Sequence, residues 1–362
     1  MDTVLVAFPF FDLSIRGFLE LWIRQSSRGM KYSCQHSIPS EEYALSKLKN
    51  EYRGIDFQRC QFWARGLNDT YFLFDSDEKR YVFRLYRRKW RTSQEIEYEL
   101  ELLDKLWKKG LSISHPYSNS KGKFSFGIKA PEGLRTGALF TDAPGTEPNY
   151  TPSISRKYGR IAAQIHKETD KLALKGTRRD IDENQLFYKP MEYVEPMLRL
   201  RLKDLDFIRK TGDTLVQQVT DSLEKKKPVW GFCHGDHHDG NAHVDSSGNL
   251  TLFDFDLGGN GWRSYDVAVF LWRQRIVHRQ TPKAKRKATR NWNGFLEGYH
   301  EVRSLAKKEL EMIPVFVFLR HIFILGMHAQ GGNVWGRNWL SKRYYDNHID
   351  FMREIAKSDN WI

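Results

Sequence analysis

Cysteine is scarce in this chain of 362 residues, which contains three, at positions 34, 60 and 233. They are scattered, odd in number and without a CxxC spacing, so the pattern argues against a disulfide framework and predicts free thiols. Reduced cysteines are typical of a cytoplasmic protein, and we expect that location.

Long apolar runs are also lacking. We expect no membrane span, because we find no stretch of about 18 consecutive apolar residues. Residues 1–29 come nearest to one, but Asp12 and Arg16 interrupt their apolar pattern and no basic region precedes it. We treat residues 1–29 as an N-terminal extension of uncertain status. Either Met30 is the physiological start and the upstream residues are an artefact, or the extension forms an amphipathic helix on the N-terminal lobe.

Acidic residues are in the minority, with 45 Asp and Glu against 58 Lys and Arg, and the formal net charge is +13. Such an excess attracts polyanions, including nucleotides, nucleic acids and acidic membranes. The basic clusters at 225–227 and 283–287 are not combined with aromatic residues in any RRM, KH or helix-turn-helix pattern. We therefore expect no nucleic-acid partner and interpret the clusters as solvated faces.

The hydrophobic share of 40% is enough for the core of one large two-lobed unit. The first part of the pattern predicts a helix at 40–52, an antiparallel hairpin at 61–74 and 80–86, and a helix at 95–109. We place an N-terminal nucleotide-binding lobe at residues 30–140. Helical patterns dominate after Ser155, so residues 141–362 are predicted to form a larger catalytic and acceptor-binding lobe.

The segment CHGDHHDGN contains His234, Asp236 and Asn241 at the spacing HxDxxxxN, and Asp254 follows in LFDFD. Phosphoryl transfer requires a carboxylate that accepts or orients the proton of the acceptor hydroxyl. It also requires an amide oxygen and a second carboxylate that hold Mg²⁺ on the nucleotide phosphates. The pattern therefore predicts an ATP-dependent, magnesium-requiring phosphotransferase with Asp236 as catalytic base and with Asn241 and Asp254 as metal ligands.

The spacing alone is moderately specific, and its context strengthens it. An apolar VWGF precedes the motif, SSGN forms a turn, apolar LTLFDF carries the second aspartate, and SYDVA opens a helix. The alternative is that these Asp and Asn residues lie in ordinary surface turns, where both are common. The succession of strand, turn and strand favours the catalytic interpretation.

This segment resembles the catalytic core of the aminoglycoside phosphotransferase and choline kinase superfamily, and within it most of all the type II homoserine kinases and their relatives. The similarity runs from about residue 38 to 355 and includes GLNDTYFLF, YVFRLYRRKWR, EIEYELELL and ALFTDAPG. It implies an α+β, protein-kinase-like fold with a small antiparallel-sheet lobe and a larger, mainly helical lobe. By the same resemblance His234 supports the catalytic loop, and Asp266 in SYDVA caps a helix and fixes that loop.

In the small lobe, strand YVFR puts Arg84 where kinase-like folds usually carry a phosphate-binding lysine, and Glu99 matches its ion-pair partner. The arginine departs from the commonest pattern. A guanidinium keeps the charge and binds a carboxylate or phosphate through two donors, but it needs a different geometry from an ammonium. Arg84 therefore either holds nucleotide phosphates or only pairs with Glu99.

The loop GLNDT, which contains Asn68, lies where a nucleotide-covering loop is expected, yet it is not a GxGxxG. A plain hairpin turn is an equally good interpretation. Around Phe140 to Ala143, which includes Asp142, the resemblance implies an inter-lobe hinge whose backbone binds adenine.

Four histidines within ten residues, His234, His237, His238 and His243, also invite a metal interpretation. Zinc requires three or four ligands that converge at tetrahedral geometry, and this spacing fits no standard zinc pattern. We therefore expect no zinc centre.

Three classes of function are compatible with these motifs. A kinase of small molecules is favoured, a protein Ser/Thr kinase with the same machinery is the alternative, and a non-catalytic nucleotide- or RNA-binding protein is the third. The expected partners are ATP and a small-molecule hydroxyl acceptor. The net charge of +13 gives no support to a strongly cationic aminoglycoside. The pattern identifies neither the acceptor nor the oligomeric state.

The segment 320–345 is a candidate wall of the acceptor pocket. It places His321 and His328 seven residues apart, then a Gly-Gly pair that predicts a helix break, then Trp335 and Trp339 four residues apart. Two aromatic side chains at that spacing on a helix can form one face. The alternative is that both Trp residues pack into the lobe's own core.

Overall fold

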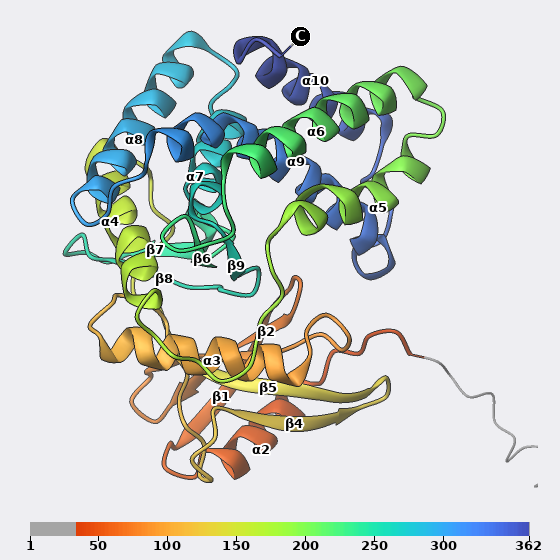
Figure 1. Cartoon of the computed structure of the whole chain (residues 1–362). Coiled ribbons are helices and arrows are strands. Elements are labelled where there is room, and N and C mark those ends of the chain that lie inside the picture. The colour runs from red at the N-terminus through yellow and green to blue at the C-terminus, as the bar shows by residue number, and fades with distance from the viewer. Residues whose placement is uncertain (1–33, 362) are drawn as a thin grey trace, which may run out of the picture.

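The computed structural model describes residues 34–361, apart from the side chain of Asn333. Two lobes are evident in Figure 1, a small one built on an antiparallel sheet and a larger one that is mainly helical. The predicted fold class is confirmed. The expected N-terminal extension, residues 1–29, lies outside the described residues.

The small lobe contains a five-stranded sheet and two helices. Its elements are α2 (Glu41–Glu51), β1 (Phe57–Arg65), β2 (Asp69–Asp75), β3 (Arg80–Leu85), α3 (Ser93–Lys108), β4 (Ser125–Ala130) and β5 (Gly133–Thr141). The strands pair in the order β1-β2-β3-β5-β4, and every pair is antiparallel. The predicted hairpins and both predicted helices are present.

Alternation along β2 and β3 divides the sheet into two faces. Tyr71 on β2 lies opposite Phe83 on β3, and both are fully buried with Leu48 of α2 in the small-lobe core. The next residues along each strand point to the other face of the sheet, where Phe72 and Arg84 line the cleft between the lobes. Because side chains of a strand alternate between faces, the core of the lobe and the wall of the cleft come from the same two strands.

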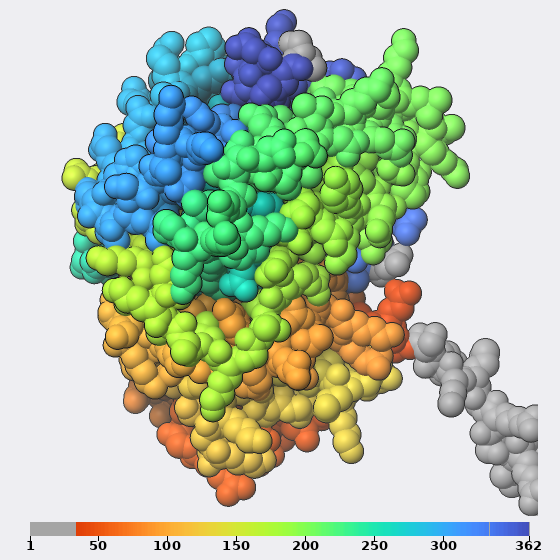
Figure 2. Space-filling model, viewed as in Figure 1, coloured from red at the N-terminus to blue at the C-terminus, as the bar shows by residue number. Residues whose placement is uncertain are grey.

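The large lobe consists of helices around two short two-stranded sheets. Its elements are α4 (Pro152–Thr169), η1 (Asn184–Tyr188), α5 (Lys189–Met197), α6 (Leu202–Ser222), β6 (Trp230–Cys233), η2 (Asp239–Asn241), β7 (Ala242–Val244), β8 (Leu250–Leu252), β9 (Gly259–Trp262), α7 (Arg263–Val277), α8 (Pro282–His300), α9 (Lys307–Trp335) and α10 (Lys342–Ser358). In the space-filling view this lobe rests directly on the small one (Figure 2). Strand β5 ends at Thr141, next to the predicted division at residue 140, which stays a prediction.

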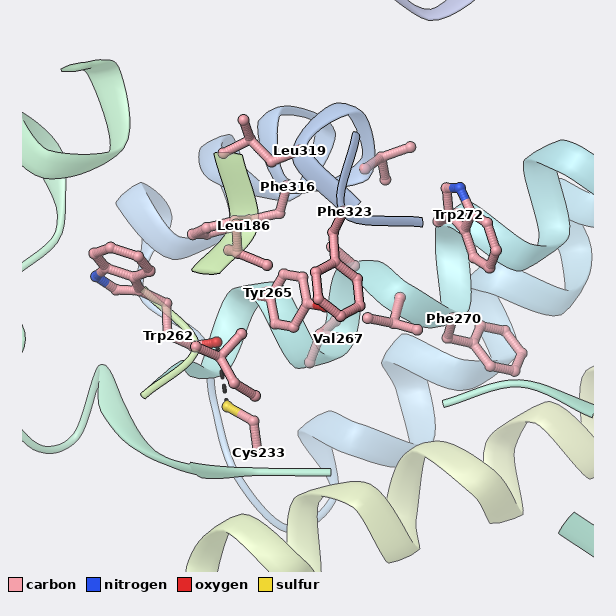
Figure 3. Packing of buried hydrophobic residues seen from close by; sticks show 14 of the residues in the cluster. Leu186, Cys233, Trp262, Tyr265, Val267, Phe270, Trp272, Phe316, Leu319 and Phe323 are labelled. Carbon is pink, nitrogen blue, oxygen red and sulfur yellow. Dashed lines mark hydrogen bonds between the residues drawn. The ribbon is translucent and has the colours of Figure 1, made fainter. Parts of the chain in front are cut away.

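Aromatic and aliphatic side chains of α7 and α9 form the centre of the large lobe (Figure 3). Tyr265 and Trp262 contact Phe316, and each of these three residues is at most 1% exposed. The thiol of Cys233 donates to the carbonyl of Trp262 at 3.4 Å. All three cysteines are unpaired, as the sequence predicts.

Helix α9 corrects one expectation. Its segment Lys307–Gly332 is long and apolar enough, by length and composition, to cross a membrane, although no such stretch was expected. Of its most apolar window, 78% is buried inside the protein. A helix that is apolar all round is typical of the core of a large lobe as well as of a membrane, and burial assigns α9 to the core.

Helices α4 and α8 approach each other closely enough to require glycine at the contact. A Cβ atom on Gly159 would lie 1.9 Å from the carbonyl oxygen of Phe295. A Cβ atom on Gly298 would lie 1.8 Å from the carbonyl oxygen of Arg156. Both neighbours are backbone atoms, so the helices themselves would have to separate.

Gly159→Ala should therefore lower the free energy of unfolding by about 1–3 kcal/mol, the usual range for overpacking, measured by urea unfolding. Gly54→Ala is the matched control, because a Cβ atom there meets nothing within 4 Å. Equal stability of the two variants would show that α4 and α8 do not pack at this distance.

Candidate active site

His234 follows β6 directly and is fully buried. Its Nε2 donates to the carbonyl of Phe253 at 3.1 Å, and its Nδ1 accepts from the backbone N–H of Asp236 at 3.2 Å. Burial, helped by the neighbouring His237, lowers the pKa of His234 to about 3. The ring is therefore neutral, and it connects the turn at Asp236 to the segment that leads into Asp254.

The carboxylate of Asp236 has partners on both oxygens. Its Oδ2 accepts from Asn241 Nδ2 at 2.9 Å and lies 3.3 Å from His238 Nε2, while Arg320 donates to Oδ1. Burial alone would raise the pKa of Asp236, but the charges of His238 and Arg320 outweigh it and hold the pKa well below its usual range. The carboxylate is ionised and fixed in orientation.

Asn241 ends the short turn η2 and is buried. Its amide nitrogen donates to the carbonyl and to the carboxylate of Asp236, at 3.0 and 2.9 Å. The amide oxygen therefore lies on the opposite side of the planar group. The carbonyl of Asn241 accepts from the backbone N–H of Phe253 at 3.0 Å, which brings Asn241 beside the segment carrying Asp254.

Asp254 follows β8 and has a φ of 61°, a left-handed conformation that aspartate tolerates better than most residues. Its Oδ1 lies 3.0 Å from a guanidinium nitrogen of Arg84, and 43% of its side-chain surface is open to the cleft. Burial among protein atoms raises the pKa of Asp254, and the carboxylates of Asp256 and Asp236 add to this while Arg84 opposes it.

The cleft between the lobes contains a cavity of about 610 Å³. The residues of the small lobe that line it include Asn68, Phe72, Val82, Arg84, Glu99, Phe140 and Asp142. The large lobe contributes Gly240, His243, Phe253, Asp254 and Phe255. Of the predicted catalytic base and the two predicted metal ligands, Asp254 lines this cavity. Asp236 and Asn241 are hydrogen-bonded to each other and lie beside the cavity, next to Gly240, which lines it.

Arg84 and Glu99 form the predicted ion pair, at 3.2 Å. Sequence reasoning missed Arg178, which binds the other oxygen of Glu99 at 2.8 Å and is itself buried. Arg178 also donates to the carbonyls of Phe255 and Asp256, at 3.0 and 2.6 Å. Glu99 therefore joins a strand of the small lobe to the segment that follows Asp254. No local motif marks Arg178, because its partners lie 77 to 83 residues away.

Asp256, the second aspartate of LFDFD, was also missed. It is buried, and its Oδ2 accepts from the indole of Trp90 at 2.6 Å. Arg91 donates to the carbonyl of Asp256. The signal in the sequence that could have pointed to Asp256 was its position two residues after Asp254, a predicted metal ligand. The contacts assign it to holding the lobes together.

The loop around Asn68 forms a tight hairpin turn between β1 and β2, and it also lines the cavity. Asn68 is 7% exposed, and its side-chain oxygen accepts from the backbone N–H of Arg87 at 3.0 Å. That contact braces the turn. The hairpin-turn interpretation is confirmed, and a role of this loop in covering a nucleotide stays a prediction.

The predicted hinge follows β5 and borders the same cavity. Phe140 is 4% exposed, and the carboxylate of Asp142 pairs with Arg80 at 2.9 Å. The carbonyl of Thr141 accepts from Ser114 at 2.6 Å, and that of Ala143 accepts from His243 at 2.7 Å. The Asp142 side chain thus has a partner in the small lobe, and contact with a base would come from the backbone.

Asp266 is fully buried in the first turn of α7, but its side chain does not cap the helix, so that part of the prediction is wrong. It accepts instead from the backbone N–H groups of His234 and Gly235, at 2.8 and 2.7 Å. The Nε2 atoms of His166 and His237 donate to it at 2.8 and 3.1 Å. Asp266 thereby fixes the catalytic loop, as expected.

The group of possible metal ligands in the structure has different members from the four histidines that lie close together in the sequence. Among the described residues, His166, His237 and Asp266 are the group whose ligand atoms lie within 4.8 Å of one another. Both histidines donate to the carboxylate, and His166 Nδ1 lies 2.7 Å from the hydroxyl of Tyr299. Hydrogen bonds account for this cluster.

The segment 320–345 differs from its prediction. Helix α9 runs through the Gly-Gly pair to Trp335, so the expected break is absent and Trp339 lies beyond the helix. A Cβ atom on Gly331 would lie 2.2 Å from the Trp335 ring, so glycine is needed there for packing. Both Trp rings contact His328, and the indole of Trp335 donates to the carbonyl of Gly66 at 3.1 Å. This part of the segment reaches the mouth of the cleft.

Fold and cleft together define a protein of the protein-kinase-like phosphotransferase class. The chain belongs to the phosphotransferase enzyme family, whose model matches residues 60–305. The resemblance drawn from the motifs is confirmed at this level.

Two relatives and one solved structure show the extent of the similarity. An uncharacterized protein of Deinococcus radiodurans is 32% identical over 86% of this chain and 89% of that protein. Amicoumacin kinase of Bacillus subtilis is 26% identical over 87% of this chain and 92% of its own. The structure of amicoumacin kinase hAmiN in complex with AMP-PNP, Ca²⁺ and Ami has a TM-score of 0.72, at 24% identity, over 88% of this chain and 94% of that one.

The buried histidines make stability depend on pH. Burial lowers the pKa of His166 to about 3, so in the folded state it stays neutral while an unfolded histidine takes a proton near pH 6.5. Its contribution to stability is complete above pH 6.5 and is lost as the pH falls from there toward 3. We expect the free energy of unfolding to fall with pH by up to ~1.4 kcal/mol per pH unit for each such histidine.

The change in the free energy of unfolding with pH, measured by urea unfolding between about pH 6 and pH 5, should be less steep in His166→Gln than in wild type. The difference should equal the contribution of one histidine. His300→Gln, at an exposed position, is the control and should keep the wild-type slope. An unchanged slope in His166→Gln would mean that His166 takes its proton in the folded protein.

Proposed function

We propose that this chain is an ATP-dependent kinase that transfers the γ-phosphoryl group to a hydroxyl of a small molecule. The observation that carries the proposal is the joining of Asp236 to Asn241, beside a cavity lined by Asp254, Arg84 and Glu99. The similarity to amicoumacin kinase supports a small molecule as the acceptor rather than a protein side chain.

In this proposal Asp236 binds the acceptor hydroxyl. Its low pKa makes it a weak base toward a free alcohol, but the transition state of phosphoryl transfer is loose, so early proton removal is not required. Its main task is to orient the hydroxyl oxygen toward the phosphorus and to take the proton as the new bond forms.

Asn241 and Asp254 fit a magnesium site by their donor type and charge. Mg²⁺ prefers oxygen ligands from one or two carboxylates together with substrate phosphates. The Asn241 amide turns its nitrogen to Asp236 and thus its oxygen away, and the Asp254 carboxylate is open to the cleft. Burial is the main cause that raises the pKa of Asp254, and the carboxylates of Asp256 and Asp236, which add to it, would also favour a cation there. Such an ion would neutralise charge on the phosphates during transfer.

In this proposal Arg84 binds phosphate oxygens. Its guanidinium contacts Glu99 and Asp254 and lines the cavity. Glu99 keeps a second partner in Arg178, so Arg84 can turn one nitrogen to a phosphate without leaving Glu99 uncompensated. We place the purine against the backbone of residues 140–143 and the acceptor toward Trp335, whose indole reaches Gly66.

Incubation with ATP, Mg²⁺ and a library of small hydroxyl compounds should shift the mass of an acceptor by one phosphate, about 80 Da. Asp236→Asn should lose about 10²- to 10⁴-fold in rate, the usual effect of removing a general base, with ATP affinity nearly unchanged. Asp213→Asn, at an exposed position of α6, is the matched control. An Asp236→Asn enzyme with more than half the wild-type rate would refute the assignment. Transfer to protein substrates alone would instead favour a protein kinase, and ATP binding without turnover a sensor.

Arg84→Met should raise the KM for ATP by about 10- to 100-fold, because a hydrogen bond to a charged group contributes about 1.5–3 kcal/mol. Arg59→Met is the control. It removes a half-exposed arginine of β1 that pairs with Glu78, and it should leave the KM for ATP unchanged. If both variants bind ATP equally well, Arg84 serves only to pair with Glu99 and Asp254.

A further inference from the structure

Arg320 is a charged residue inside the most apolar of the helices that the structure describes. It lies on α9 and is 1% exposed, among side chains that form the core of the large lobe. Burying a guanidinium costs several kcal/mol unless its donors are satisfied. Its partners therefore indicate what the charge is for.

Those partners belong to the catalytic loop and to α7. One terminal nitrogen donates to the carbonyl of Gly235 at 2.9 Å and to the hydroxyl of Tyr265 at 3.1 Å. The other terminal nitrogen donates to Oδ1 of Asp236. The guanidinium carbon also lies 5.2 Å from the ring of Trp272 and 5.3 Å from that of Phe323. Tyr265, Trp272 and Phe323 are labelled in Figure 3.

We propose that Arg320 is the positioning residue for Asp236: it holds Oδ1 while Asn241 holds Oδ2, and so fixes the plane in which the carboxylate meets the acceptor hydroxyl. This inference rests on the proposed function. Arg320 is not among the residues that line the cavity, and it acts through the carboxylate that it binds.

The loop is held between opposite charges from two helices. Asp266 of α7 accepts from the backbone N–H groups of His234 and Gly235, while Arg320 of α9 donates to the carbonyl of Gly235 and the side chain of Asp236. Donors and acceptors of the same peptide segment are therefore satisfied from opposite sides. This arrangement fixes the direction of the Asp236 side chain as well as the path of its backbone.

A purely structural ion pair would not need this geometry, and the same lobe contains one for comparison. Arg263 is also fully buried, pairs with Asp170 at 2.7 Å and donates to the carbonyl of Phe232. None of its recorded hydrogen bonds or ion pairs in the described chain involves Asp236. Arg263 is therefore the matched control for the loss of a buried guanidinium.

Arg320→Ala, Arg320→Lys and Arg263→Ala should be compared with wild type, using the acceptor found in the library and a temperature well below each melting point. For Arg320→Ala we expect kcat to fall by about 10²-fold or more, because small misplacements of a reacting group have effects of that size. The KM for ATP should change little. Arg263→Ala should melt earlier with kcat within about three-fold of wild type, since it removes stability but no contact with Asp236.

Two further measurements keep the inference falsifiable if Arg320→Ala folds poorly. Arg320→Lys keeps the positive charge but lacks the forked guanidinium group. It should therefore remain folded and still lose most of kcat. Low-millimolar guanidinium should partly restore kcat in Arg320→Ala, and it should not raise kcat in Arg320→Lys or Arg263→Ala.

The outcomes separate the two proposals. If wild type phosphorylates an acceptor and either Arg320→Lys or a folded Arg320→Ala keeps more than half of kcat, Arg320 does not position Asp236, while the kinase function stands. Equal losses of kcat in Arg320→Ala and Arg263→Ala would likewise overturn the inference. If wild type transfers phosphate to no acceptor, the proposed function fails, and the role of Arg320 fails with it.

Discussion

The buried carboxylate of Asp266 is the contact on which the loop at residues 234–236 depends. It is fully enclosed, yet it stays ionised because two histidines and two backbone N–H groups donate to it. Removing those donors would leave a charge in the core, which is far less favourable than the bonded state. The turn at His234 and Gly235 is therefore determined by where α7 packs. Since α7 packs against α9, the position of Asp236 is coupled to the largest hydrophobic core of the protein.

The lobes are aligned by a second set of buried charges. Arg84, Arg178 and Arg91 face Glu99, Asp254 and Asp256, so three cations meet three carboxylates at the junction between sheet and helices. Individual pairs in water contribute little, but buried and multiply bonded ones are costly to break. The network fixes how far β3 and α3 lie from the segment after β8. It thereby sets the width of the cavity in which phosphates would be bound.

Sequence reasoning succeeded where the relevant residues are close along the chain. The spacing of His234, Asp236 and Asn241 reflects one turn, and the period-two and helical patterns predicted the strands and helices of the small lobe. It failed where contacts join distant segments: Arg178 and Arg320 carry no local signal, because their partners lie 55 to 85 residues away. The prediction of a helix break at the Gly-Gly pair was wrong for a related reason. Glycine weakens a helix by propensity, but tertiary packing under Trp335 requires its small size and keeps α9 continuous.

The arginine at position 84, a departure from the family's usual lysine, fits its surroundings. An ammonium is a single point charge, whereas the guanidinium fork contacts Glu99 and Asp254 with separate nitrogens. Glu99 in turn divides its two oxygens between Arg84 and Arg178. Binding of a phosphate and a divalent ion would draw Asp254 toward the metal and free one guanidinium nitrogen for the phosphate. The charge would then stay balanced without any buried group losing its partner, and buried charges that lose their partners are costly.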